Sequence, residues 1–187
     1  MRCSSRSAVT LALGAVLLLA AGCSVGPQAH PVVLGPPSSR HAVAEQPPAT
    51  STPVEVFFVL DGRLVPQVRH VAVGPGLTSC LAGLVLPLSA KESSAGLRSA
   101  LPTGVTALPA HVNGAVAIID VPAGFDRLTV SDQILAVAQL VFTVTANTYL
   151  TRVAMAQNGH VLAMPDQSGQ LVSHPLGRAD YASLGPR

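Results

Sequence analysis

The feature that constrains this chain most is its N-terminus, where a basic and then apolar segment runs into a cysteine. Arg2 and Arg6 precede residues 8–21, an uncharged stretch of 14 residues rich in Leu and Ala. That length fits the apolar region of a signal peptide and falls short of the ~20 residues that a membrane-spanning helix needs. We therefore predict that residues 1–22 are a removable leader and that Cys23 begins the mature chain.

The residues before Cys23, Leu19-Ala20-Ala21-Gly22, resemble the lipobox of bacterial lipoproteins. The lipobox prefers Leu three positions before the cysteine, where this chain has Ala20. The resemblance implies that Cys23 is lipidated with palmitate-type acyl chains and anchors the protein to the outer face of the cytoplasmic membrane. Two or more acyl chains hold a protein stably on a membrane, whereas one chain is marginal. The alternative is an ordinary secretory signal with a chance cysteine.

Residues 24–52 have the composition of a tether. They include six prolines among many Ser and Ala residues and show no sustained hydrophobic period. Such a segment cannot bury enough apolar surface to offset its ordering entropy, and Pro-rich chains favour extended conformations of ~3 Å per residue. We predict a lipidated cysteine and disordered tether over residues 23–52, a folded domain over 53–182 and a tail over 183–187.

The charge and cysteine content of the mature chain exclude several classes of function. Without Arg2 and Arg6, nine basic residues face nine acidic ones, so the clustered positive charge that nucleic acid requires is missing. Cys80 is the only other cysteine of the mature chain, which excludes a disulfide framework and a thiolate metal cluster. It lies in an apolar run, where we expect a buried and inert thiol. A domain of roughly 130 residues needs neither metal nor disulfide to fold.

Alternating apolar residues and turn signals predict hairpins in three places. Residues 54–60 and 63–73 flank Asp61-Gly62, with Pro66 marking an edge position or a bulge. Residues 105–112 and 115–121 flank Asn113-Gly114, which favours a type I′ turn. Residues 151–157 and 160–164 flank Asn158-Gly159, and 170–176 form a further short strand.

Helical spacing of apolar residues predicts two helices. One runs from Leu77 to near Pro87, and the other begins at Thr129, whose hydroxyl precedes Asp132 as in a capping box. The second helix has an open C-terminal end, because Phe142-Thr-Val-Thr145 also has strand propensity. Together the elements predict a single α+β domain, a mainly antiparallel sheet with two helices packed on one face.

The order of these motifs resembles the GerMN (sporulation and spore germination) domain. The resemblance covers about residues 53–182. It rests on the Asp61-Gly62 hairpin, a Leu-rich first helix, the loop Gly96-Leu-Arg-Ser-Ala-Leu-Pro-Thr-Gly104, the strand Val116-Ala-Ile-Ile-Asp-Val121, the second helix, the Asn158-Gly159 hairpin and Pro175-Leu-Gly-Arg-Ala-Asp-Tyr181. It implies an α+β module without known enzymatic activity, used in extracytoplasmic assembly or as an accessory domain, with no catalytic residues to carry over.

Residue types with catalytic or metal-binding chemistry do not converge in the sequence. Asp120 ends an apolar strand, where we favour a hydrogen bond to a loop amide over a buried catalytic acid. His70, His111, His160 and His174 lie on separate segments without metal-ligand spacing. We therefore predict no catalytic residue, no cofactor and no metal, and a protein that is not an enzyme.

Two functions of different classes remain open. The first is a non-catalytic interaction or assembly module that binds an envelope protein or polymer. Its contacts would come from the loop Lys91–Gly104, through Lys91 and Arg98, and from the edge strand 63–73, because long ordered loops and free strand edges often bind partners. The second is a small-ligand sensor or carrier with a pocket between sheet and helices.

Overall fold

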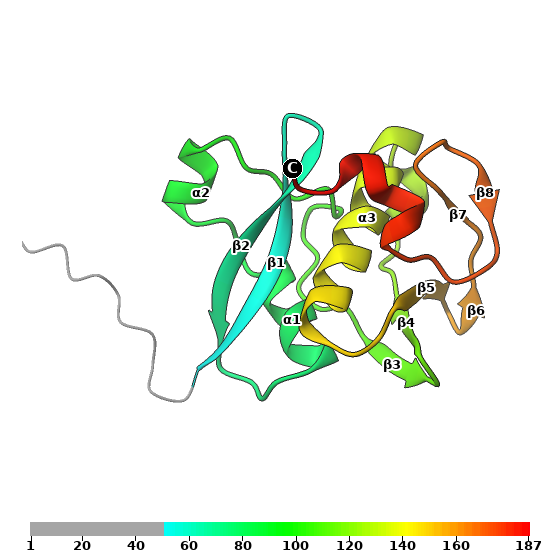
Figure 1. The fold of residues 1–187 in the computed structure, drawn as a ribbon, viewed down its shortest axis with the longest axis horizontal. Coiled ribbons are helices and arrows are strands. Elements are labelled where there is room, and N and C mark those ends of the chain that lie inside the picture. The colour runs from blue at the N-terminus through cyan, green and yellow to red at the C-terminus, as the bar shows by residue number, and fades with distance from the viewer. Residues whose placement is uncertain (1–50) are drawn as a thin grey trace, which may run out of the picture. The chain divides into compact units, whose positions relative to one another are not determined.

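The computed structural model describes residues 51–187 (Figure 1). The predicted leader, Cys23 and nearly all of the predicted tether lie outside the described residues. The predictions made for them therefore remain predictions.

The first hairpin forms where the sequence predicts it. Strand β1 (Thr52–Leu60) pairs antiparallel with β2 (Arg63–Val71), and both turn residues have positive φ, 49° at Asp61 and 75° at Gly62. These two residue types tolerate positive φ better than most, which explains the tight turn. Pro66 faces Phe57 in an uninterrupted register, so it marks an edge and not a bulge. In the described part of the chain, β2 has no second strand partner.

Helix α1 (Leu77–Val85) follows the hairpin and packs tightly on it. Its apolar face buries Cys80, Leu81 and Leu84. The approach to β1 is close: a Cβ on Gly83 would lie 2.6 Å from a Val54 methyl group. The helix ends at Val85, two residues before Pro87. A short helix, α2 (Ala90–Ser94), lies in the loop after it.

Helix α3 (Val130–Asn147) is the central element of the fold. The Thr129 side chain accepts a hydrogen bond from the Asp132 amide, which confirms the predicted cap. All ten residues from 135 to 144 are buried, so the helix is covered on every side. The strand propensity of Phe142–Thr145 is overridden by this tertiary environment, in which the Thr143 hydroxyl accepts a hydrogen bond from the Phe57 amide across 3.1 Å.

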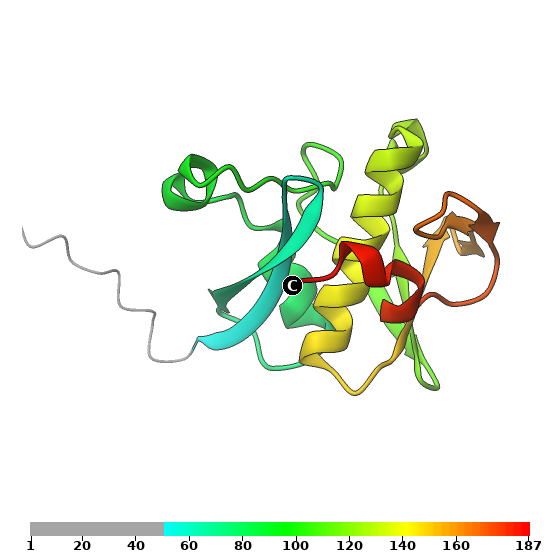
Figure 2. The same ribbon diagram turned by 45° about the horizontal axis from the view of Figure 1, so that its top comes forward.

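The second sheet lies on the other side of α3 from the β1–β2 hairpin (Figure 2). Its strands follow the order β3 (Ala110–Asn113), β4 (Val116–Asp120), β5 (Arg152–Gln157) and β6 (His160–Val161). Strands β4 and β5 are parallel because α3 connects them as a crossover, and the other two pairings are antiparallel.

Short elements complete the C-terminal part. Strands β7 (Met164–Pro165) and β8 (Leu171–Val172) pair antiparallel, and two 3₁₀ helices, η1 (Phe125–Arg127) and η2 (Arg178–Leu184), follow β4 and β8. Tyr181 of η2 is fully buried and its hydroxyl donates to the Pro165 carbonyl across 2.6 Å. None of the described helices combines the length and apolar character that crossing a membrane requires.

The α+β class with mainly antiparallel pairing is confirmed, but several details differ from the prediction. The described strands form three separate sheets instead of one, and α3 lies between two of them because it is apolar on all sides. The second hairpin turns at Gly114-Ala115, one residue later than predicted, and only Gly114 has positive φ. This register places Ala117 and Ile119 in the core. Residues 105–109, predicted as strand, form irregular backbone.

Candidate interaction surface

The loop that follows α1 is fixed to the fold by one buried arginine. Arg69 of β2 is 8% exposed, and all five of its N–H groups donate. Nε and Nη2 bond the Glu92 carboxylate at 3.2 and 2.7 Å, while Nη1 and Nη2 bond the carbonyls of Gly83, Leu86 and Pro87. The guanidinium also lies 4.5 Å from the Phe58 ring centroid. A charge-assisted network of this kind gives one orientation to the segment that it holds.

Glu92 joins the same network from α2. Its carboxylate bonds the Ser89 amide while the Ser89 hydroxyl accepts from the Glu92 amide, which forms a capping box. Partial burial alone would raise the pKa of Glu92, but hydrogen bonds from Arg69 and Ser89 outweigh it and hold the pKa below its ordinary value. The sequence analysis missed Arg69. The available signal was its position two residues before the apolar Val71, on the same face of a strand.

The two residues predicted for an interaction loop both lie on the surface. Lys91 is on α2, and Arg98 lies where the loop pairs with the free side of β1 through Val59, by backbone hydrogen bonds of 2.8 and 2.9 Å. The Arg98 guanidinium is 3.4 Å from the Asp132 carboxylate at the start of α3, and both side chains are substantially exposed. Leu97, Ala100 and Leu101 of the loop point into the core.

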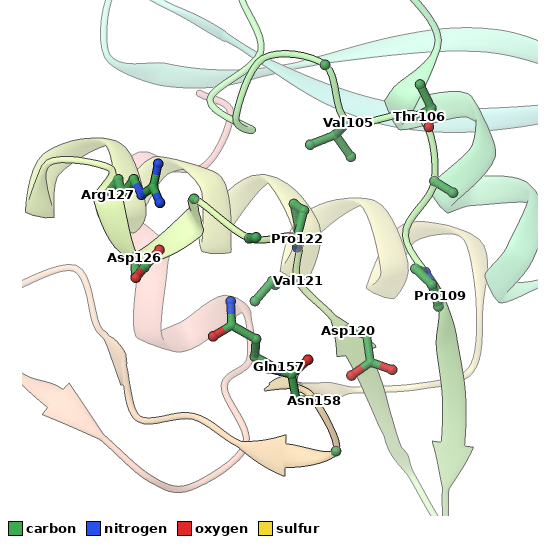
Figure 3. A pocket seen from close by; sticks show the side chains of 15 residues that line it. Val105, Thr106, Pro109, Asp120, Val121, Pro122, Asp126, Arg127, Gln157 and Asn158 are labelled. Atoms are coloured by element: carbon green, nitrogen blue, oxygen red, sulfur yellow. The ribbon is translucent and has the colours of Figure 1, made fainter.

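An open cleft of about 680 Å³ begins where this loop ends (Figure 3). One wall is the irregular segment 104–109, and the other is 120–124 with η1 and the β5–β6 turn. The cleft exists because β3 and β4 separate at their prolines. The Asp120 amide donates to the Pro109 carbonyl at 2.8 Å as the last rung, and Pro122 has no N–H to extend the ladder.

Six polar side chains line this cleft: Thr106, Asp120, Asp126, Arg127, Gln157 and Asn158. Figure 3 shows Arg127 and Asp126 towards one end of it, and Asp120 and Asn158 towards the other. Within residues 51–187 none of these side chains takes part in a hydrogen bond or an ion pair, and the loop-amide bond expected for Asp120 is not formed. Unengaged polar groups on a folded surface are free to bind another molecule.

A second cleft of about 440 Å³ connects this cleft with the predicted loop. It is lined by Arg98, Pro102, Thr103 and Asp132, and it shares Ala123, Gly124 and Arg127 with the first cleft. We call the combined surface the polar end, defined by Arg98, Asp120, Asp126, Arg127, Asp132 and Asn158. It lies at the carboxyl ends of β4 and β5 and at the N-terminus of α3. The structure thus joins Arg98 to Asp120, which the sequence analysis considered as an acid, and to Asp126 and Arg127, which it did not select. Lys91 lines neither cleft.

The remaining chemical candidates stay apart. His70, His111, His160 and His174 are all exposed and lie on different segments. No group of three His, Cys, Asp or Glu side chains that would suit a metal ion occurs within residues 51–187. Cys80 is a buried free thiol, as predicted, and burial raises its pKa to about 11. A thiol so buried is a poor nucleophile.

Comparison with known proteins decides the family. Residues 50–163 match the Germane (GerMN) family, described as sporulation and spore germination. The chain belongs to this family. As a GerMN protein it resembles "Lipoprotein LpqB" of Cutibacterium acnes, with 32% identity over 143 residues. That match covers 71% of this chain, and the chain spans only 23% of the length of that relative.

Solved structures show the same GerMN fold. The tandem GerMN domains of the sporulation protein GerM from Bacillus subtilis match with a TM-score of 0.55 at 21% identity, over 70% of this chain and 47% of that one. The first GerMN domain of GerM alone matches with a TM-score of 0.51 at 19% identity, over 68% and 98% of the two chains. The GerMN resemblance predicted from the sequence is therefore confirmed.

Proposed function

We propose that this GerMN protein is a lipoprotein of the cell envelope, attached through Cys23 to the outer face of the cytoplasmic membrane. The basic and apolar leader, the small residues before Cys23 and the similarity to a relative named as a lipoprotein support the proposal. In this position the domain acts as a non-catalytic interaction or assembly module that binds an envelope protein or polymer.

The observation that carries the interaction role is the polar end. Its side chains are held on a rigid framework, because the Arg69 network fixes one end of the loop and the Val59–Arg98 pairing fixes the middle. Yet the polar groups around the larger cleft are not engaged within the domain. A rigid surface with unused donors and acceptors loses little entropy on binding and offers both charge signs to a partner.

The small-ligand alternative requires a pocket between sheet and helices. That space is filled by the ten consecutive buried residues of α3 and by the side chains of β1 and β4. The two clefts of the polar end are open and lie between loops. Their shape suits an extended polymer segment or a protein surface better than an enclosed small molecule.

Charge reversals test the proposal. The full-length protein is purified from solubilised membranes of its own cell together with any bound partner. The amount of partner bound is compared between wild type and the variants Arg98→Glu, Arg127→Glu and Lys91→Glu. Glu55→Lys, an exposed charge reversal on β1, is the matched control. We expect Arg98→Glu and Arg127→Glu to lose the partner with an unchanged melting temperature, because rim charges govern association more than folding. Retention of every partner by Arg98→Glu and Arg127→Glu would remove the polar end as the interface, and retention by Lys91→Glu would remove the surface of α2.

The anchor is tested separately with Cys23→Ser. We expect this variant to lose fatty-acid labelling and to leave the membrane fraction, while its folded domain still captures the partner. A variant that stays membrane-bound and matures normally would exclude Cys23 as the anchor.

A further inference from the structure

The end of the domain opposite the polar end is formed by three segments without charge. Residues 72–76 join β2 to α1, residues 111–115 include the β3–β4 turn, and residues 146–151 comprise the last two residues of α3 and its connection to β5. None of the three contains Asp, Glu, Lys or Arg. They meet around one cleft of about 600 Å³, lined by Pro75, Leu77, Val112, Tyr149 and Leu150, among others. Figures 1 and 2 both show the three segments at the same end of α3.

Large apolar side chains at this end point outwards. Tyr149 is 81% exposed, Val112 45% and Val73 40%, one on each segment. We call these three residues, together with the cleft that Val112 and Tyr149 line, the apolar end. Tyrosine combines an apolar ring with a hydroxyl that stays hydrated, and for that reason it is enriched where proteins meet the boundary between lipid headgroups and acyl chains.

The chain from Cys23 enters the domain at the apolar end. Thr52 begins β1 and pairs with Val71, the residue immediately before the first uncharged segment. Glu55 lies nearby, since its backbone N–H and C=O both bond the Asn147 side chain near the end of α3. The first strand of the described residues therefore begins beside the apolar end, at Thr52.

We propose that the apolar end docks on the surface of the bilayer to which Cys23 attaches the protein. The inference rests on the anchor proposed above. Three side chains bind a membrane weakly by themselves. A Pro-rich tether of 29 residues at ~3.1 Å per residue spans about 90 Å, which keeps the domain at a high effective concentration near the surface. With Tyr149, Val112 and Val73 at the headgroup boundary, α3 stands away from the membrane and the polar end faces the envelope space.

The composition of the docking surface also specifies the lipid requirement. The three segments supply no cation to bind anionic headgroups. Arg152, which follows the third segment, is ion-paired with Asp180 at 3.3 Å, and the backbone of the acidic residue Glu55 bonds Asn147. Docking is therefore driven by apolar contact, and it persists on zwitterionic phosphatidylcholine and at high salt, where polybasic binding would be lost.

The chain contains no tryptophan, so a single introduced tryptophan reports its own surroundings. Tyr149→Trp is made in the full-length lipidated protein and reconstituted in phosphatidylcholine vesicles with and without brominated acyl chains. Leu171→Trp, at a residue that is 66% exposed on β8, is the matched control. We expect a blue shift of the Tyr149→Trp emission and a loss of about half its intensity on brominated lipid, because a docked ring lies ~5–10 Å into the interface. Leu171→Trp should show neither change.

Flotation with the vesicles measures attachment independently of docking. If both variants float and neither is quenched, or both are quenched equally, the docking inference is wrong while the anchor stands. A blue shift of Tyr149→Trp without vesicles that grows with protein concentration would assign the apolar end to a second copy of the chain and overturn membrane docking. A wild-type protein that does not float lacks the attachment on which docking depends, and it overturns both proposals.

Discussion

The two ends of α3 differ in what their exposed side chains are made of. At its N-terminus lie the charged and amide groups of the polar end, while at its C-terminus the three connecting segments carry Tyr149, Val112 and Val73 and no charge. An 18-residue helix of about 27 Å separates them. Under the two proposals above, the same small domain offers an aqueous partner and a membrane two different surfaces, and the helix between them holds these surfaces apart.

The largest loss of stability is expected from a charge placed in the core that surrounds α3. Ile119 of β4 and Val137 of α3 are both fully buried. Ile119→Asp or Val137→Asp buries an unpaired carboxylate, which costs an amount comparable to the whole free energy of unfolding of a domain, about 5–15 kcal/mol. We expect neither variant to fold, as measured by circular dichroism and thermal melting. A cooperative melt in either variant would mean that the residue does not lie in the core.

A smaller loss of stability is expected from replacing the buried Arg69 than from these core charges, and almost none from replacing the exposed Arg127. Arg69→Met removes five donated hydrogen bonds and leaves the Glu92 carboxylate without its cation, so we expect a loss of about 3–5 kcal/mol in the free energy of unfolding. Arg127→Met removes a side chain without an intramolecular partner in residues 51–187, and we expect a change within about 0.5 kcal/mol. Urea titration of both variants makes the comparison. Equal losses would show that the polar end is a structural element and not a free surface.

The pH dependence of stability tests the same network. The pKa of Glu92 lies below its ordinary value of 4.5 in the folded protein. Its contribution to stability is therefore fully present above the unfolded pKa and is lost as the pH falls through the folded pKa. We expect wild type to lose stability on acidification below about pH 4.5 and the Glu92→Gln variant to show a shallower slope there. Parallel slopes for the two proteins would contradict the role of the Glu92 ion pair.

The smallest changes in stability are expected at the two surfaces themselves. Tyr149→Ser and Arg127→Glu each alter an exposed side chain and should leave the melting curve within about 0.5 kcal/mol of wild type. Each variant should lose a different function. Arg127→Glu should lose the partner, and Tyr149→Ser should lose the protection of the apolar end by lipid. Hydrogen exchange of residues 146–151 on vesicles measures the second loss. Variants that each lose both properties would show that the two ends are not independent.

Local sequence signals predicted the elements that depend on local chemistry. The Asp61-Gly62 turn, the Thr129 cap and the spacing of Leu77, Leu81 and Leu84 are sufficient to place a hairpin and two helices. Phe142–Thr145 remained open because strand propensity and helical burial favour different structures for the same residues. Only the packing of α3 between two sheets decides between them.

What the sequence did not predict depends on contacts between distant segments. Turn signals predict which strands pair in a hairpin, but no local pattern records that β4 pairs with β5 across the α3 crossover or that the strands divide into three sheets. The role of Arg69 depends on carbonyls 14 to 18 residues away. The cleft of the polar end arises where Pro109 and Pro122 separate two predicted strands. Residues 105–109, which the sequence predicted as strand, form irregular backbone and line this cleft.

Under the export proposed above, the parallel pairing of β4 and β5 bears on how the chain acquires its structure. Paired residues of the β1–β2 hairpin are at most 19 positions apart in the sequence, as in Thr52 and Val71. In the β4–β5 pair, Val116 pairs with Arg152, which lies 36 positions later. When the chain crosses a membrane N-terminus first, we expect the hairpin to form early. The face of the hairpin that carries Phe57 then remains exposed to water until α3, which supplies Phe142, has been translocated and packs on it. In this interval the chain is most exposed to aggregation and to proteases.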